Sequence, residues 1–240
     1  MCGRYSLTTP VGALQILFEF EDLPNLAPRY NIAPTQEVAA VRAAPDAPAP
    51  EGGARRQLAM LRWGLIPSWA KDPAIGARMI NARAETLAEK PAFRAAFRAR
   101  RCLLPADGFY EWQAREGGPK QPFHIARQDG GPFAFAGLWE RWRDPADGAT
   151  VESCTIVTTA ADARLRPIHH RMPVILAQEN FGLWLDSAAP LDRLQAVLAA
   201  DPGLDLVATA ISTRVNKVAN DSPEILEPLE DGPPVQARLL

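Results

Sequence analysis

At residues 101–112 the chain reads RCLLPADGFYEW, an apolar strand followed by a turn and a second strand. Later runs rich in β-branched or aromatic residues, bounded by Gly, Pro and Asp, also have the character of strands. Because these runs are neighbours in sequence, antiparallel pairing between them is favoured. The chain is therefore predicted to have a β-rich core. The further predicted strands are residues 37–43, 57–63, 123–127, 133–139, 152–159 and 205–212.

Glu111 is the one acid between two aromatic residues, Tyr110 and Trp112. A carboxylate among bulky rings tends to lose its water, which raises its pKa and suits proton transfer near neutral pH. A partly buried glutamate in an ion pair would have the same neighbours. Both interpretations of Glu111 stay open from the sequence.

The first five residues are Met1-Cys2-Gly3-Arg4-Tyr5. A small residue at position 2 lets methionine aminopeptidase remove Met1, after which Cys2 carries an α-amine and a thiol on neighbouring carbons. Such a 1,2-aminothiol captures aldehydes: the amine forms an imine, the thiolate adds to the same carbon, and a thiazolidine closes. The amine and the thiol ionise at about 7.7–8.0 and about 8.5, so we expect both to react without an elaborate activating site. An incidental small residue at a frayed terminus would look the same.

Helices are predicted at four places. The first has Thr9 as its N-cap and Pro10 at the first helical position. Two others are expected near residues 179–185 and 191–200. The fourth, residues 91–101, carries the densest basic patch, for which a solvated face is the commoner explanation. Its Phe93 and Phe97 are expected to face inward, and its outward arginines are Arg94, Arg98, Arg100 and Arg101.

Residues 79–86, MINARAET, alternate in the manner of an extended segment and place Asn81, Arg83 and Glu85 on one face. A solvated edge would show the same alternation. The alanines between these residues are too small for a strong core stripe, however, so we interpret the face as selected for its polar groups.

The segment WGLIPSW at residues 63–69 places Trp63 and Trp69 in a bent stretch. Aromatic residues in bent loops are more often core plugs, but Trp is also suited to stacking on an exposed base. The segment IHHRMP at residues 168–173 offers a second site, because a histidine pair can act as acid or base, although a lone His is more often structural. In an extended stretch the two rings would face opposite ways.

Composition limits the classes of function. Lys and Arg number 26 against 28 Asp and Glu, a net charge of −2, so nucleic-acid binding would need a local cluster of Arg. The three cysteines are widely spaced, which argues against a disulfide framework and a zinc site and favours a reducing cytoplasm. No apolar run approaches the roughly 18–20 residues of a membrane span, and no metal or other cofactor is expected. Residues 44–54 are interpreted as an exposed loop and the tail 228–240 as irregular, within one domain of residues 1–240.

Seven blocks of the sequence, spread from residue 2 to about residue 227, resemble the SRAP family (SOS response-associated peptidase, or abasic-site processing proteins). The resemblance implies an α+β fold, in which peripheral helices surround a β-rich, barrel-like antiparallel core. It also implies covalent capture of abasic sites in single-stranded DNA near replication forks. The expected partner of this cytoplasmic, nucleoid-associated monomer is abasic single-stranded DNA, with replication-fork proteins as further candidates. The blocks are MCGRY (1–5), YNIAP (30–34), WGLIP (63–67), NARAET (81–86), RCL to GFYEW (101–112), AGLW (136–139) and IHHRMP (168–173).

The resemblance also implies the roles of individual residues. Cys2 would be the nucleophile, and Asn81 would orient it. Glu111 would accept a proton from the ammonium, and His169 would protonate the sugar ring oxygen, although the adjacent His170 leaves the choice of ring open. These side chains would meet in one cleft, with His170 pointing elsewhere. The residues implied to contact DNA are Arg83, Arg4 and Arg171 for phosphates and Trp63 or Trp69 for stacking.

Two other functions stay open. An N-terminal cysteine with Glu and His nearby could act as a peptidase, at least on its own leader. A single Met needs no self-cleavage, which ranks general proteolysis below DNA capture. In the third alternative the chain is a non-catalytic module that binds single-stranded DNA, and Cys2→Ala would leave all activity intact.

Overall fold

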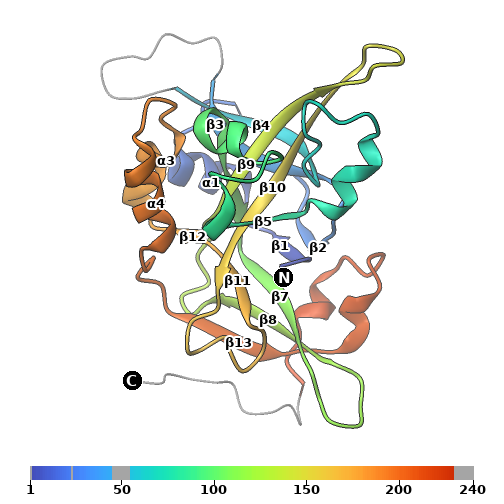
Figure 1. The fold of residues 1–240 in the computed structure, drawn as a ribbon. Coiled ribbons are helices and arrows are strands. Elements are labelled where there is room, and N and C mark those ends of the chain that lie inside the picture. The colour runs from blue at the N-terminus through green and yellow to red at the C-terminus, as the bar shows by residue number, and fades with distance from the viewer. Residues whose placement is uncertain (1, 23, 45–54, 230–240) are drawn as a thin grey trace.

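A computed structural model describes residues 2–22, 24–44 and 55–229. At its centre, strands of the larger sheet close into a barrel in the order β10-β4-β3-β6-β9, with β9 pairing back to β10 (Figure 1). Closure leaves the barrel strands without free edges. The contact between β4 and β10 is parallel, with Ser153 opposite Arg62, and the other barrel pairings are antiparallel. The barrel strands are β3 (Glu37–Ala43), β4 (Arg56–Trp63), β6 (Arg101–Ala106), β9 (Phe133–Arg143) and β10 (Thr150–Ala160).

Strand β10 extends beyond the barrel and carries further strands on both edges. On one edge β5 (Asn81–Arg83) runs parallel to it, and on the other β11 (Arg171–Pro173) runs antiparallel. The short β12 (Ile175–Leu176) adds to β9. This extension brings Asn81 and the residues before Arg171 to the same end of the barrel.

A second, antiparallel sheet packs against the barrel. Residues 101–112 run from one sheet into the other, because β6 ends at Ala106 and β7 begins at Gly108. The Phe135 ring of the barrel meets Tyr5 and Phe109 of the second sheet edge to face, with centroids 5.7 and 6.0 Å apart. The two sheets therefore share one core. The strand order is β13 (Leu206–Ala210), β8 (Gln121–Arg127), β7 (Gly108–Gln113), β1 (Tyr5–Leu7) and β2 (Arg29–Ile32).

The turn between β6 and β7 depends on Asp107 and Gly108. A side chain at Gly108 would place its Cβ 2.2 Å from His124 Nε2, so only glycine fits. The Asp107 carboxylate accepts hydrogen bonds from the backbone and hydroxyl groups of Thr8 and Thr9, the latter hydroxyl at 2.6 Å. Thr9 is therefore not the N-cap of the first helix. That position is held by Pro10, and the prediction is wrong because Asp107 binds the hydroxyl of Thr9 instead.

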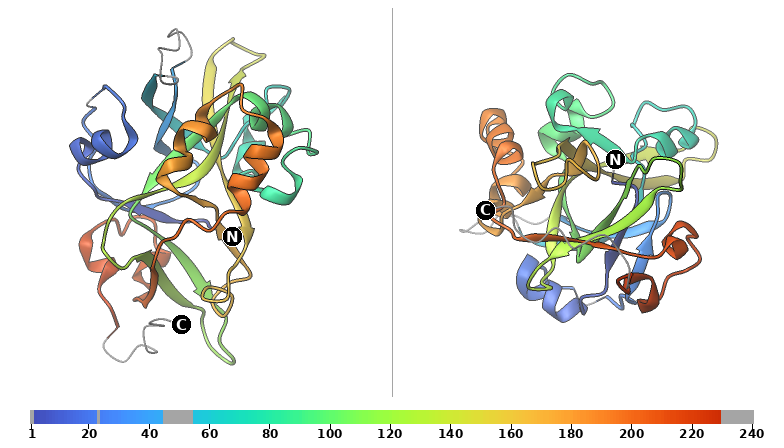
Figure 2. Two further views of the ribbon diagram at one scale, coloured as in Figure 1. Left: turned by 90° about the vertical axis from the view of Figure 1, so that its left-hand side faces the viewer. Right: turned by 90° about the horizontal axis from the view of Figure 1, so that it is seen from below.

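The helices lie at the periphery, on different sides of the barrel (Figures 1 and 2). Helices α3 and α4 lie side by side, and the segment containing η4 and η5 lies on the other side, next to β7 and β8. No helix in the described ranges is long and apolar enough to cross a membrane. The α-helices are α1 (Val11–Phe18), α2 (Arg94–Ala99), α3 (Phe181–Leu185) and α4 (Leu191–Ala199). The 3₁₀ helices are η1 (Pro73–Arg78), η2 (Ala84–Thr86), η3 (Gln178–Asn180), η4 (Thr213–Asn216) and η5 (Pro223–Leu226).

Helix α2 is shorter than predicted, and Arg101 does not lie on its exposed face. Arg101 is the first residue of β6 and only 3% exposed. Its Nη1 donates to the carbonyl oxygens of Phe97 and Arg98, both at 2.6 Å. The last carbonyls of a helix lack partners within it, so a buried guanidinium that satisfies them stabilises the helix end.

The predicted α+β fold, with a β-rich barrel-like core and peripheral helices, is confirmed. Two details are wrong. The pairing is mixed, because β10 runs parallel to β4 and β5. Residues 79–86 are extended only as far as Arg83, after which η2 turns Glu85 away from the strand. Most of the expected loop at 44–54 and of the tail at 228–240 lies outside the described residues.

Candidate functional site around Cys2

Cys2 lies where the barrel meets the second sheet, and its side chain is fully buried. On the barrel side, Asn81 Nδ2 in β5 donates a hydrogen bond of 2.9 Å to the carbonyl oxygen of Cys2. On the other side, the Tyr110 N–H in β7 donates to the carbonyl oxygen of Arg4 at 3.0 Å. The chain just before β1 is thus held between one strand of each sheet.

Asn81 has a second polar atom, Oδ1, which is buried. Among the residues that the structure describes, none donates a hydrogen bond to it. A buried acceptor without a donor is unfavourable by about 1–3 kcal/mol, so such atoms are normally satisfied. Asn81 Oδ1 can therefore accept an N–H or O–H from a group that enters beside Cys2.

Glu111 lies in β7 and is only 4% exposed. Burial raises the pKa of its carboxyl to about 7. Burial also raises the pKa of the Cys2 thiol, and the charge of Glu111 adds to this effect. Our expectation that the thiol ionises near its ordinary value is therefore wrong. Glu111 itself can both take up and release a proton near neutral pH.

His169 lies in the loop that leads into β11 and is half-buried, which lowers its pKa. Its Nδ1 is 3.0 Å from the backbone nitrogen of Arg171 and 3.1 Å from the carbonyl oxygen of the same residue. The ring can therefore accept from the N–H when neutral and donate to the carbonyl when protonated. The ring of His170 stacks on His169 with a centroid distance of 4.4 Å, so the prediction that the rings face opposite ways is wrong. The reason is that these residues lie in a loop, not in a strand.

Two arginines of the predicted phosphate site already have protein partners. Arg171 forms a two-pronged ion pair with Glu85, with Nη–Oε distances of 2.5 and 3.0 Å, and donates to the carbonyl oxygen of Thr158 at 2.6 Å. Arg4 Nη1 donates to Asn31 Oδ1 at 2.7 Å and to the carbonyl oxygen of Val215 at 2.9 Å. By contrast, Arg83 is exposed, and among the described residues its side chain has no hydrogen-bond or ion-pair partner.

The hydrogen bonds of Arg4 belong to a network around Asn31, which is fully buried. Asn31 Nδ2 donates to the carbonyl oxygens of Val215, Lys217 and Asn220 at 2.8–3.2 Å. The sequence left open whether this Asn serves turn chemistry or ligand contacts, and the structure shows that it holds the segment after η4 against β2. Sequence reasoning missed this role because the partners are more than 180 positions away.

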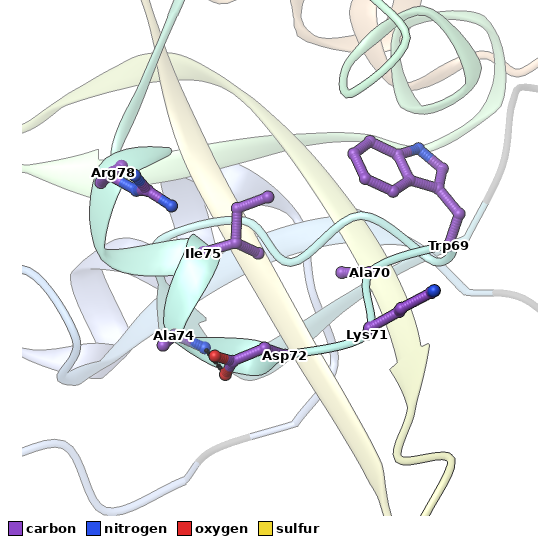
Figure 3. Close-up of a pocket in the computed structure, with 7 residues that line it drawn as sticks. All are labelled: Trp69, Ala70, Lys71, Asp72, Ala74, Ile75 and Arg78. Atoms are coloured by element: carbon purple, nitrogen blue, oxygen red, sulfur yellow. Dashed lines mark hydrogen bonds between the residues drawn. The ribbon is translucent and has the colours of Figure 1, made fainter.

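The two tryptophans have different surroundings. Trp63 is fully buried, its Nε1 donates to the carbonyl oxygen of Ile80 at 2.9 Å, and its ring packs edge-on against Tyr5. A base cannot stack on it in this structure. Trp69 is 58% exposed and borders a hollow of about 650 Å³ with Lys71 and Arg78 (Figure 3). Of the two stacking candidates, only Trp69 has a face that a base can reach.

The structure thus joins Cys2 to Asn81 by a hydrogen bond and places Glu111 within electrostatic reach of the Cys2 thiol. His169 lies before β11, on the same extension of β10, and the charge of Lys120 lowers the pKa of both Glu111 and His169. In the part of the chain that the structure describes, no three His, Cys, Asp or Glu side chains are grouped so that they could hold a metal ion.

Known proteins resemble this chain over almost its whole length. It is 42% identical over 231 residues to the abasic site processing protein YoqW of Bacillus subtilis (strain 168), which covers 95% of this chain and 99% of that protein. It is 33% identical over 273 residues to the abasic site processing protein HMCES of Gallus gallus, covering 99% of this chain and 81% of that protein.

Solved structures show the same fold. A crystal structure of a protein from Bacteroides thetaiotaomicron matches with a TM-score of 0.81 at 25% identity, covering 95% of this chain and all of that one. One from Bordetella bronchiseptica matches with a TM-score of 0.71 at 30% identity, covering 88% of this chain and all of that one. The family model described as SOS response associated peptidase (SRAP) matches residues 1–218. The chain belongs to the SRAP family.

Proposed function

We propose that this protein processes abasic sites in DNA and does so by capturing the sugar aldehyde covalently on Cys2. The names of its relatives support abasic-site processing. The observation that carries the covalent mechanism is the setting of Cys2, which is buried, bound through its carbonyl by the Asn81 amide, and within electrostatic reach of Glu111, whose carboxyl has a pKa of about 7. An abasic deoxyribose in its ring-opened form is an aldehyde, the group that a 1,2-aminothiol captures.

The reaction begins when Met1 is removed and the α-amine of Cys2 is free. The neutral amine attacks the aldehyde carbon, and loss of one water gives the imine. The sulfur of Cys2 then adds to the same carbon, its proton passes to the imine nitrogen by way of a base, and the thiazolidine closes. Asn81 fixes the carbonyl of Cys2 and offers Oδ1 to the amine N–H, which fits its buried, unmatched acceptor.

Glu111 carries the protons in these steps. It accepts the proton that leaves the ammonium and releases it to solvent. Once more unprotonated, it accepts the thiol proton as the sulfur adds and passes it to the imine nitrogen. A base is needed there because burial keeps the thiol protonated at neutral pH. His169, whose Nδ1 can either accept from or donate to Arg171, delivers a proton to the sugar ring oxygen and favours the open aldehyde.

Binding of single-stranded DNA rests on the exposed groups around this centre. Arg83 holds a phosphate beside the lesion, and Trp69 offers a face for base stacking. With a net charge of −2, the protein binds through a local site, not through its overall charge. Three or four phosphate contacts imply a log–log salt slope of about −2 to −3. The protein acts as a cytoplasmic, nucleoid-associated monomer during the response to DNA damage.

The test is to incubate the Met-processed protein with a single-stranded oligonucleotide that carries one abasic site. We expect a heat-stable band that contains both protein and DNA. Cys2→Ala should abolish the band, whereas Cys102→Ala, which changes another fully buried cysteine, should retain it. A variant with one alanine inserted between Met1 and Cys2 has no free aminothiol and should be inert. A normal rate of crosslinking by that variant would exclude the thiazolidine mechanism.

A second candidate function is a cysteine peptidase that acts on its own leader. The electrostatic effect of Glu111 on the buried Cys2 thiol favours it, because a thiol with a base in reach can act as a nucleophile. To separate the two functions, the mass of the N-terminus is measured in wild type and in Glu111→Gln, each carrying an added leader of several residues. Removal of the leader in wild type only would support peptidase activity, and retention in both would exclude it.

A further inference from the structure

A cation that the sequence analysis did not single out acts on two residues of the Cys2 site. Lys120 is exposed and immediately precedes β8, in the loop of the β7–β8 hairpin. Gln121, the next residue, pairs with Gln113 at the end of β7. Gln113 Nε2 donates a hydrogen bond of 3.0 Å to the carbonyl oxygen of Pro167, which ties this end of the hairpin to the loop that carries His169.

The charge of Lys120 affects residues on both of the structural elements that meet at the site. Its charge lowers the pKa of Glu111, which lies in the second sheet, and that of His169, which lies on the extension of β10. Coulomb interactions through solvent weaken over about 8–10 Å at physiological ionic strength. A single ammonium that acts on both residues therefore lies within about that distance of each.

The other basic residues near the site differ in availability. Arg4 is occupied by Asn31 and Val215, and Arg171 is occupied by Glu85 and Thr158. Neither could turn to a phosphate without leaving buried polar partners unsatisfied, which is unfavourable. Two exposed cations have neighbours in the site: Arg83 lies two residues after Asn81, and Lys120 lies next to Gln121, which pairs with Gln113 two residues after Glu111.

We propose that Lys120 binds a backbone phosphate next to the captured sugar, while Arg83 binds the phosphate on the other side of that sugar. The inference rests on the proposed function and deepens it by naming the second phosphate contact. A lysine suits this position, because its long stem and compact charge can follow a flexible single strand.

Phosphate binding at Lys120 has a chemical consequence. The phosphate offsets the positive charge that acts on Glu111 and His169, so both residues hold a proton more strongly once DNA is bound. The other titratable groups in this set are the chain's α-amino group, which lowers the pKa of both residues, the Cys2 thiol, which is coupled to Glu111, and His170, which acts on His169. DNA binding would thus prepare the acid that opens the sugar ring.

The first test measures noncovalent binding in a Cys2→Ala background, so that its outcome does not depend on crosslinking. Affinity for an abasic single-stranded oligonucleotide is measured between about 50 and 200 mM salt. The two proteins compared are Cys2→Ala with Lys120 unchanged and Cys2→Ala that also carries Lys120→Gln. Loss of one phosphate contact should flatten the log–log slope by about 0.7, and Lys120→Arg should restore it. Arg115→Gln, an exposed cation in the same hairpin, is the matched control and should leave the slope unchanged. An unchanged slope in Lys120→Gln, or an equal loss in Arg115→Gln, would overturn the inference.

The second test follows the pH profile of capture in the protein with Cys2 intact. Removing the charge in Lys120→Gln should move the midpoints of the profile to higher pH, whereas a merely structural role of Lys120 would change the rate without moving them. Unmoved midpoints would contradict the placement of Lys120 beside the pair. Failure of wild type to form any crosslink would instead contradict the proposed function.

Discussion

The centre of the site and its rim are built in opposite ways. Cys2 and Glu111 are almost fully buried, burial raises the pKa of both, and the charge of Glu111 raises that of Cys2 further. Arg83, Lys120 and Trp69 are exposed and face solvent. In the proposed function, burial adjusts the chemistry while exposed groups supply binding. Changes at the centre should therefore alter pH dependence and leave salt dependence unchanged, whereas changes at the rim should alter salt dependence, at Lys120 together with pH dependence.

The largest effect is expected from Glu111→Gln. The amide keeps the shape of the side chain but cannot accept a proton, and general acid–base catalysis contributes about 10²–10⁴-fold to rates. We expect the rate of crosslinking at neutral pH to fall within that range while the salt dependence of binding stays as in wild type. Single-turnover crosslinking measured at several salt concentrations checks both. A flattened salt slope in this variant would show that a buried residue also affects DNA binding, which would contradict the distinction between centre and rim.

The same variant should be more stable than wild type at neutral pH. In the folded protein Glu111 keeps its proton up to a pH of about 7, whereas its ordinary pKa is 4.5. The folded state binds more protons between these values, so this contribution to stability is present at low pH and lost as pH rises through about 7. The gain in Glu111→Gln should grow over this range to at most about 3 kcal/mol. Denaturant unfolding of both proteins at pH 5 and pH 8 measures it, and parallel pH dependences would contradict it.

At the rim, Trp69→Ala should weaken binding of single-stranded DNA. Base stacking on an aromatic ring is worth about 1–3 kcal/mol per base. The reaction with a small aldehyde should be unaffected, since the indole lies outside the centre. Ile16→Ala is a suitable control, because Ile16 is 82% exposed on α1. Affinity titrations of both variants decide the point, and an equal loss in the two would show that Trp69 has no special role.

A smaller change is expected for Arg83→Ala. Removing one phosphate contact should flatten the salt slope by about 0.7 and slow capture at moderate salt. Reaction of Cys2 with a free aldehyde should continue, because that chemistry needs no phosphate contact. If capture of DNA at moderate salt were untouched, the phosphate role of Arg83 would be wrong.

The smallest effect is expected from Glu85→Gln, which breaks the pair with Arg171. The pair is partly exposed, with Glu85 at 50%, so its loss should reduce stability by less than about 1 kcal/mol at pH 7. The hydrogen bond from Arg171 holds the pKa of Glu85 below its ordinary 4.5, so the contribution is present above that pH and lost as pH falls. Salt titrations of DNA binding test the comparison further. If the freed Arg171 bound a phosphate, the log–log slope of affinity against salt would become steeper.

Local patterns in the sequence predicted much of the fold. The strand at residues 37–43 matches β3, and the helix near residues 191–200 matches α4 within one residue, because periodicity and turn residues act over short distances. The parallel contact of β10 with β4 was not predictable from neighbouring runs, since it joins strands about 90 positions apart.

For the site, the sequence located the motifs but not the partners. The hydrogen bond between Asn81 and Cys2 agrees with the orienting role that the resemblance implied, and that role stays a proposal. The occupation of Arg4 by Asn31 and of Arg171 by Glu85 depends on contacts between distant segments, which no local pattern reveals. No local pattern reveals the effect of the Lys120 charge on Glu111 and His169 either.

Residues 101–112 run from the barrel into the second sheet, so the relative position of the site residues depends on how the two sheets pack against each other. Cys2 and Glu111 move with the second sheet, while Asn81 and His169 move with the extension of β10. A small rotation of one sheet against the other would separate these pairs without breaking either sheet. Heat or denaturant should therefore abolish capture before the barrel strands lose their protection from hydrogen exchange, and bound DNA, which spans both halves, should bring the two events together.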